Sequence, residues 1–349
     1  MRRHRSRPLS DKTYDGLQFA AVSVILGMPY LFVKLALRGF SPEFVAFART
    51  ALAALVFTAV VGPGPVIGGF RRAGRPILWF AVVQFAVPLF LIAEAEQRIS
   101  SALTGVLIAS EPLWVALLAT RLDRAQRSSR RGVLGVLLGL AGVALLLGVD
   151  NAQGTQLVGG LLVVAAAACY AGAALWLPRA TARVEPRPLI AAGLAVACLV
   201  LAPFGAAALP HAAPSATAVV SLAVLAVVGT ALGFSMWFAL LGRIGAARAS
   251  LVTYTSPVVA VALGAVALGE SFHPDAVAGA GLIFVGSLLA ARGVTVAARA
   301  PQPPSPDRTK TGVSPSDEGY PASTSPSPSG SSTSRTDSRS SSATRTAAS

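Results

Sequence analysis

Stretches of about 20 predominantly apolar residues recur along the chain, and each is long enough to cross ~30 Å of hydrocarbon as an α-helix. Short breaks that contain Gly, Pro or Arg separate them, such as VGPGPVIGGFRRAGRP and LGESFHPD. The pattern predicts ten spans, near residues 16–37, 43–62, 76–95, 101–120, 131–149, 157–177, 188–209, 217–241, 247–268 and 274–293. The chain is therefore expected to be an all-α polytopic membrane protein.

The two ends of the chain differ from this apolar region. Residues 1–15 are polar and basic, and residues 300–349 are rich in Pro, Ser and Thr with almost no large apolar side chains. Neither segment can fold alone, so we expect a basic cytoplasmic N-terminal segment and a disordered C-terminal cytoplasmic tail. The first span follows basic residues, as in a signal peptide, but no cleavage pattern of small residues follows it and further spans do.

Composition also favours a location in lipid. Hydrophobic residues make up 54% of the chain and charged residues 13%, about half the usual charged share of a soluble protein. The net charge of +14 alone would suggest a nucleic-acid partner. Most of the 29 lysine and arginine residues, however, fall in the N-terminal segment, in alternate breaks or just after the last span, as expected for the cytoplasmic side, and they are too scattered for one nucleic-acid groove. Both termini are therefore predicted to be cytoplasmic, which requires an even number of spans.

Side chains typical of metal, redox or hydrolytic sites are sparse. Cys169 and Cys198 lie inside apolar spans, where cysteine behaves as a small apolar residue. His4, His211 and His273 fall in the ends or the breaks. No nucleotide-binding glycine motif accompanies a soluble domain. We therefore expect no enzyme activity, no cofactor and no metal site.

An internal repeat relates the two halves of the apolar region. A shift of 144–145 residues places Pro42 on Pro186, Arg98 on Arg243, Pro112 on Pro257, Gly135 on Gly279 and Gly142 on Gly286. The repeat defines a first unit, residues 16–149, and a second unit, residues 157–293. Because each unit has an odd number of spans, five, the second must cross the membrane upside down relative to the first. Inverted repeats place the substrate site near the bilayer midplane, between the halves.

Characteristic segments occupy matching places in the two units. They are AEQRISSALTGVLIASEPLWVALLA in the first unit and LGRIGAARASLVTYTSPVVAVALGAVALGES in the second. These segments resemble the EamA-type permeases of the drug/metabolite transporter (DMT) superfamily, which consist of two five-helix repeats. Two departures stand out. Leu26 precedes Gly27 in place of the usual Trp, and Leu122-Asp123-Arg124 replaces a short turn that the second unit keeps as Gly269-Glu270.

The resemblance implies a secondary transporter of the cell (cytoplasmic) membrane that exports a small metabolite or drug by alternating access. Its partners would be the lipid bilayer and a small-molecule substrate, while proton coupling and a homodimer are left open. The alternative function is a membrane scaffold or sensor that acts through its tail. Deletion of residues 300–349 separates the two functions, because a transporter keeps its flux without the tail.

Two charged residues fall deep within predicted spans. A charge at the bilayer centre costs about 2.5–3.5 kcal/mol, so it usually faces a cavity or a partner. Glu111 lies midway along span four, directly before Pro112, and Arg49 lies two turns into span two. Helical rise places both at similar depths, so we predict a buried Glu111–Arg49 pair or a shared aqueous cavity. A structural ion pair without a role in transport is the alternative.

Glu94 and Glu96 lie at the outer end of span three. They are candidates for an acidic entrance that attracts cations, or for a coupling-proton acceptor whose pKa is raised by partial burial. The alternative is a solvated helix end in which an acidic side chain pairs with Arg98. Lys34 also matches a position of the family, although a lysine near an interface commonly snorkels.

Helix breakers and polar side chains complete the candidate site. The helix-break candidates are Pro29, Pro112 and Pro257, since a broken helix frees carbonyls inside a transporter. The candidates for hydrogen bonding or stacking on a ligand are Gln84, Trp114, Trp237, Tyr254 and Thr255. For the aromatic side chains, packing against lipid or the protein core is the alternative.

Overall fold

The computed structural model describes residues 11–122, 130–149, 154–181, 185–244, 251–270 and 274–293, and every regular element in these ranges is a helix. The predicted tail, the first ten residues and Asp123-Arg124 lie outside them. In chain order the helices are α1 (Asp11–Gly27), α2 (Pro29–Ala36), α3 (Pro42–Val61), α4 (Pro63–Ala73), α5 (Pro76–Ala81), η1 (Val82–Ala86), α6 (Val87–Ala95), α7 (Ser101–Ile108), α8 (Glu111–Leu122), α9 (Arg130–Val149), α10 (Gly154–Thr181), α11 (Pro186–Ala207), α12 (Ala216–Val224), η2 (Leu225–Leu232), α13 (Gly233–Ile244), α15 (Val252–Leu268) and α16 (Pro274–Gly293).

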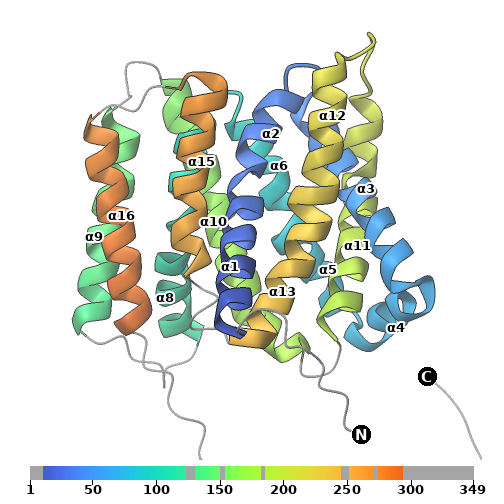
Figure 1. Ribbon diagram of the computed structural model, residues 1–349, viewed down its shortest axis with the longest axis horizontal. Coiled ribbons are helices and arrows are strands. Elements are labelled where there is room, and N and C mark those ends of the chain that lie inside the picture. The colour runs from blue at the N-terminus through green and yellow to red at the C-terminus, as the bar shows by residue number, and fades with distance from the viewer. Residues whose placement is uncertain are drawn as a thin grey trace, which may run out of the picture. The chain divides into compact units, whose positions relative to one another are not determined.

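The helices form a bundle in which most axes run between the same two ends of the molecule (Figure 1). Among the described residues, eight helical segments are long and apolar enough to cross a membrane. Two shorter apolar helices, Val252–Leu268 and Ala276–Ala290, fall within the predicted spans nine and ten. The expectation of an all-helical polytopic membrane protein is confirmed, while the number of ten transmembrane helices stays a prediction.

The starts of the helices follow from local chemistry. Ser41, Ser100 and Ser215 each accept a hydrogen bond from the backbone N–H three residues later, which caps α3, α7 and α12. Proline stands in the first turn of several helices, where its missing N–H is not needed. The polar breaks therefore define the boundaries of the helices.

One break of the sequence is itself helical. The segment VGPGPVIGGFRRAGRP contains α4, whose two prolines lie in its first turn and whose Arg71 and Arg72 lie in its last turn, where a cation is favourable. Buried Val66 and Gly69 face the bundle, and a Cβ on Gly69 would lie 2.9 Å from the carbonyl oxygen of Pro188 at the start of α11. Packing against the bundle therefore stabilises a helix in a segment whose glycines and prolines suggested only a loop between spans.

Several helices are interrupted or widened inside the predicted spans. Span one breaks at Met28, directly before Pro29, and span four breaks at Ala109-Ser110, two residues before Pro112. Spans three and eight contain the π-helical segments η1 and η2, which occupy equivalent positions under the 144–145-residue shift. At Pro257 the helix is not interrupted, because α15 continues through this residue. Its missing N–H leaves the carbonyl of Thr253 without its intrahelical donor, so the freed carbonyl stays a prediction.

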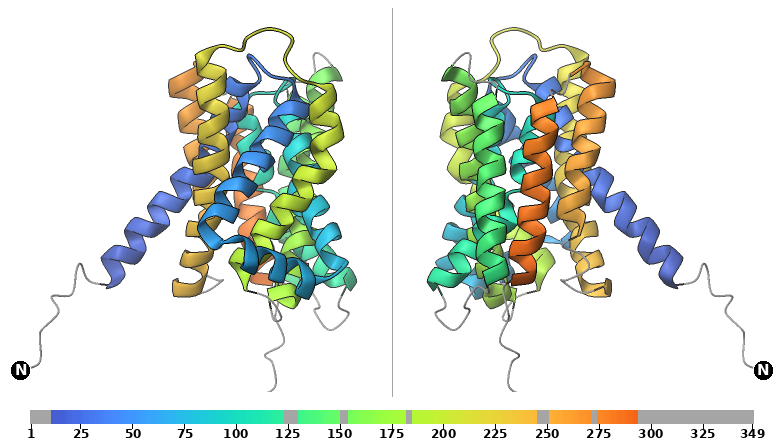
Figure 2. Two further views of the ribbon diagram at one scale, coloured as in Figure 1. Left: turned by 90° about the vertical axis from the view of Figure 1, so that its right-hand side faces the viewer. Right: turned by 90° about the vertical axis from the view of Figure 1, so that its left-hand side faces the viewer.

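Helices from opposite halves of the chain lie side by side. α16 packs along α9, α11 packs against α3, α10 packs against α6, and α15 packs against α7 and α1. Figure 1 shows the α9–α16 pair at one side of the bundle and α3 with α11 at the other. The start of α1 projects away from the bundle (Figure 2), and Tyr14 and Leu17 on it are exposed. The two units are therefore interleaved, which places both around a common interior.

Candidate substrate and coupling site

Arg49 is a buried cation that links the two halves. It lies on α3 and is 7% exposed. Its Nε donates a hydrogen bond to Oγ1 of Thr230, 2.8 Å away on η2. The Thr230 hydroxyl donates in turn to the carbonyl oxygen of Leu225, 3.0 Å away, within the same π-helical segment. The irregular helix of the second unit therefore positions the arginine of the first.

Two tyrosines that the sequence analysis missed lie around Arg49. Tyr30 follows the break in span one, and Tyr170 lies on α10. Both are close enough to Arg49 to interact with its charge, and both also interact with Glu111. A tyrosine hydroxyl inside an apolar span needs a polar partner, and this need is the signal that identifies such residues. The structure thus brings Arg49 and Glu111 to one polar cluster, the central cluster, together with Tyr30, Tyr170 and Thr230.

The predicted ion pair between Glu111 and Arg49 is wrong. The ion pairs between described residues join Glu94 to Arg98 and Asp15 to Arg243. Arg49 bonds to Thr230 instead, and Glu111 is the half-buried first residue of α8, after the break in span four. Helical rise gave the depth of the two residues correctly enough to group them, but it carried no information on the direction of their side chains. The shared aqueous cavity stays a prediction.

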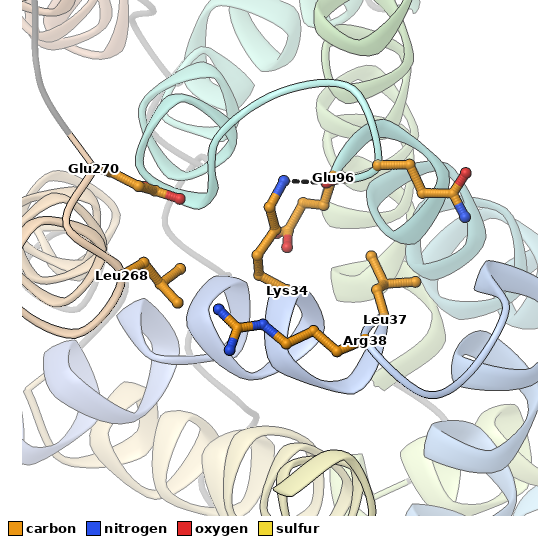
Figure 3. A pocket seen from close by; sticks show the side chains of 7 residues that line it. Lys34, Leu37, Arg38, Glu96, Leu268 and Glu270 are labelled. Carbon is orange, nitrogen blue, oxygen red and sulfur yellow. Dashed lines mark hydrogen bonds between the residues drawn. The ribbon is translucent and has the colours of Figure 1, made fainter. Parts of the chain in front are cut away.

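A second polar site, the end cavity, lies where α2, α6 and α15 end. It has a volume of about 480 Å³ and is lined by Lys34, Leu37, Arg38, Glu96, Gln97, Leu268 and Glu270. Figure 3 shows Lys34, Arg38 and Glu270 around its interior, with the Glu96 carboxyl beside the Lys34 side chain. The Lys34 ammonium donates hydrogen bonds to the backbone carbonyl oxygens of Glu96 and Ile99, the latter at 2.8 Å. Lys34 therefore ties α2 to the turn between α6 and α7.

Glu94 and Glu96 have opposite environments although they are two residues apart. Glu94 is partly exposed and forms an ion pair with Arg98 at 2.7 Å, as in the solvated helix end given as the alternative above. Glu96 is fully buried, and neither of its carboxyl oxygens has a hydrogen-bond partner among the described residues. Burial raises the pKa of Glu96, which lies one residue beyond the span Pro76–Ala95, well above its ordinary value. Of the two, Glu96 alone has the character of a proton acceptor.

Glu270 joins the second unit to a helix start in the first. Its carboxylate accepts hydrogen bonds from the backbone N–H groups of Ser101, at 2.9 Å, and Ala102, at 3.0 Å, and from the Ser101 hydroxyl. Gly269 precedes it with a φ of 66°, a left-handed conformation that glycine adopts without strain and that turns the chain back toward α7. The Gly-Glu turn therefore supplies an N-terminal cap to α7 from a distant part of the chain.

Substitution Glu270→Ala should lower the stability of the protein by about 1–2 kcal/mol, because the first amides of α7 lose their acceptor. The free energy of unfolding in detergent micelles measures the effect. Glu185→Ala is the matched control, since Glu185 precedes α11 without a side-chain hydrogen bond to it. Equal stability of the two variants would contradict the capping role.

The remaining candidates fall into separate places. Trp237 packs with Val22, Leu240 and Val252 between α1, α13 and α15, which matches the core-packing alternative. Trp114 packs against the core around α7 and α10, but its indole N–H is buried without a partner. Thr255 shares a 2.6 Å hydrogen bond with Ser23 of α1. Gln84 lies half-buried in η1, and Tyr254 lies half-buried in α15.

Comparisons with known proteins agree on one family. The sequence profile of the EamA-like transporter family matches residues 16–148 and 157–292. The chain is 28% identical over 298 residues to a "probable amino-acid metabolite efflux pump" of Salmonella typhimurium, covering 78% of this chain and 93% of that protein. It is 26% identical to an uncharacterized inner membrane transporter of Escherichia coli, covering 72% of this chain and 82% of that protein.

A solved crystal structure of another protein has the same fold. It is 20% identical in sequence, has a TM-score of 0.58, and aligns over 82% of this chain and 100% of its own. The family profile covers most of the chain in two copies, and two of its relatives are named as a probable efflux pump and an inner membrane transporter. The chain therefore belongs to the EamA-like transporter family and is an EamA-type permease of the DMT superfamily.

Proposed function

We propose that this permease exports a small organic metabolite across the cell membrane by alternating access between two inverted five-helix halves, and that protons drive the export. The ten spans are the eight long helical segments and the two shorter apolar helices. In this topology both termini are cytoplasmic, and the end cavity opens to the outer side. Family membership supports transport, and the printed names of the relatives support efflux.

Helix packing supports the inverted arrangement. If spans five apart are equivalent, the main contacts between the halves should pair equivalent spans or have a counterpart, and the contact of α8 with α16 is an exception. α9 with α16, α3 with α11, and α7 with α15 are pairs of equivalent spans. The contact of α6 with α10 has its counterpart in α12 with α2, and that of α8 with α10 in α15 with α1. A pseudo-twofold relation between the units accounts for all of these contacts except that of α8 with α16.

The buried guanidinium of Arg49 carries the proposal for the substrate. A buried charge is costly unless it is paired, and no acidic side chain of the described residues lies within ion-pair distance of it. One hydrogen bond, from Nε to Thr230, is recorded for it among those residues. A ligand carboxylate would complete its bonding, because guanidinium and carboxylate match in geometry. Amino-acid metabolites that carry a carboxylate are the first candidates, since two relatives are named as probable amino-acid metabolite efflux pumps.

Transport in proteoliposomes tests the proposal. Vesicles that contain the purified full chain are loaded with labelled amino acids and carboxylate metabolites, and release is followed with and without an opposing proton gradient. We expect release of at least one carboxylate compound above the level of protein-free vesicles, accelerated by protons from the outer side. Release of neutral or cationic compounds alone would contradict the assignment of Arg49, and flux independent of the gradient would contradict proton coupling.

A further inference from the structure

The carboxyl group of Glu96 is buried in an unusual way. The residue is 0% exposed, and within the part of the chain that the structure describes both carboxyl oxygens lack a hydrogen-bond partner. An ionised carboxylate in this position would lose its hydration without compensation, whereas a protonated carboxyl would not carry a charge. The structure is therefore compatible with a neutral Glu96.

The charged and titratable groups around Glu96 come from several elements. Lys34 of α2 and Arg49 of α3 favour the ionised form, whereas Glu270 beyond α15 opposes it, and burial outweighs them all. Tyr30 of α2 also interacts with Glu96, while Tyr170 of α10, the helix packed most closely on α6, interacts with Arg49. The net effect of burial and these charges is a raised pKa of Glu96. Of the two cations, Lys34 lowers this pKa more than Arg49 does.

The end cavity gives Glu96 a route to solvent. Arg38 and Gln97, which line the same cavity, are both exposed. A proton can therefore reach the carboxyl through a polar cavity rather than through lipid. In the proposed topology, on which this direction rests, the cavity faces the outer side.

The position of Lys34 makes the protonation state of Glu96 consequential. Its ammonium bonds to the carbonyl oxygens of Glu96 and Ile99, while its side chain lies against the Glu96 carboxyl (Figure 3). An ionised Glu96 would compete for this ammonium, since an ion pair in a buried site is stronger than a bond to a neutral carbonyl. The carbonyls of Glu96 and Ile99 would then lose their bonds to Lys34, while the ion pair keeps α2 joined to Glu96.

We propose that Glu96 is a proton-binding site reached through the end cavity, and that its ionisation moves Lys34 from the α6–α7 turn to the Glu96 carboxylate. The protonated form keeps Lys34 on the carbonyls of Glu96 and Ile99, and the ionised form frees these two carbonyls while the ion pair still joins α2 to Glu96. A metal cation fits the site poorly. Hard cations need several oxygen ligands, but the carbonyls of Glu96 and Ile99 are bonded to Lys34, and the Glu270 carboxylate is bonded to Ser101 and Ala102.

Infrared difference spectroscopy on the purified full chain in lipid nanodiscs tests the proposal without a known substrate. A titration from acid to alkaline pH should show the carbonyl band of a buried carboxylic acid that disappears well above the ordinary range of glutamate. Glu96→Gln should remove this band, and the matched control Glu94→Gln should keep it. Glu111→Gln separates the contribution of the carboxyl of Glu111, which lies within a predicted span.

Lys34→Met provides the second variant. Because Lys34 lowers the pKa of Glu96, its removal should move the titration of the band to higher pH. The protection factors for hydrogen exchange of the amides at residues 96–101, corrected for the intrinsic pH dependence of exchange, should fall on ionisation in the wild type and stay constant in Glu96→Gln. A band that survives in Glu96→Gln, or titrates in the ordinary range, overturns the site. Loss of the band on exchanging choline for sodium at constant pH overturns the choice of a proton.

The pH dependence of stability has a defined sign. Since the folded-state pKa of Glu96 is raised, its contribution favours the fold below the ordinary glutamate pKa and is lost as pH rises toward the raised value. Glu96→Gln should abolish this part of the dependence. If the infrared and exchange tests fail while carboxylate export in proteoliposomes is intact, the proton site alone is rejected. If Glu96 titrates as expected but no carboxylate is exported, the proposed function alone is rejected.

Discussion

Replacement of Gly286 by alanine is expected to destabilise the protein by about 3 kcal/mol, the upper part of the range for overpacking a tight interface. Gly286 lies on α16, where this helix packs along α9. A Cβ at this position would lie 2.6 Å from the backbone oxygen of Gly135 and closer still to the backbone nitrogen of Gly139. Because these atoms belong to the backbone of α9, the clash is relieved only by separating the helices.

The contact is reciprocal, which makes a local adjustment ineffective. A Cβ on Gly142 of α9 would lie 2.6 Å from the carbonyl oxygen of Gly279, and one on Gly279 would lie 3.1 Å from the carbonyl oxygen of Gly142. Small residues let membrane helices approach closely, and association in lipid depends on this packing because the lipid chains are as apolar as the side chains. Stability should therefore fall for substitutions on either helix.

The free energy of unfolding in mixed micelles measures the effect, and Gly281→Ala is its matched control. Gly281 lies on the same helix, and a Cβ there would meet nothing within 4 Å. Alanine at this position should leave stability unchanged or raise it by up to about 1 kcal/mol, through higher helix propensity. Similar losses for the two variants would show that glycine acts through the helix itself and not through the interface.

The internal repeat singled out these glycines in the sequence, and the close packing of α9 with α16 explains why they recur. Gly135 and Gly142 on one helix, and Gly279 and Gly286 on the other, recur at positions that the repeat relates. The apolar spans were equally readable, since hydrocarbon thickness sets their length. Such features depend on residue type and distance along the chain, both of which a sequence contains.

The central cluster was only partly predictable. Arg49 and Glu111 stood out because intramembrane charges are rare, but their partners depend on side-chain directions that spacing does not give. Thr230, which bonds to Arg49, lies in a π-helical segment 181 residues further along the chain. Tyr30 and Tyr170 look like ordinary aromatic residues of apolar spans until the helices are placed.

The end cavity shows the same limit at Glu96. Its neighbour Glu94 has the same chemistry and nearly the same position in the chain, and a sequence cannot rank the two. The end of α6 places Glu94 against Arg98, whereas the turn to α7 places Glu96 inward beside Lys34. The Glu270 cap is likewise a contact between distant segments, 168 to 169 residues apart, and no local pattern predicts it.

Arg49→Gln is expected to reduce carboxylate export by about 100-fold, since truncating one member of a buried charged pair costs roughly 2–5 kcal/mol. The stability of Arg49→Gln should stay the same or rise. The substitution removes a buried charge, and among the described residues no acidic side chain is ion-paired with Arg49 and would be left unpaired. Arg49→Lys keeps the charge but not the paired geometry, so it should retain part of the flux. Thr230→Val, which removes the oxygen that holds Nε, should reduce flux about tenfold, in line with a hydrogen bond to a charged group.

These variants separate a substrate site from a structural cation. Initial rates of export in proteoliposomes and the thermal unfolding midpoint are measured on the same preparations. If Arg49 binds the substrate, Arg49→Gln should lose flux while its unfolding midpoint stays unchanged. Arg49→Lys should then retain more flux than Arg49→Gln. A lower midpoint in Arg49→Gln, with flux per folded protein unchanged, would instead mean that the guanidinium holds α3 to η2 and that the substrate carboxylate binds elsewhere. Because Thr230 belongs to the second unit and Arg49 to the first, any loss of flux in Thr230→Val at constant stability would also place the substrate between the two halves.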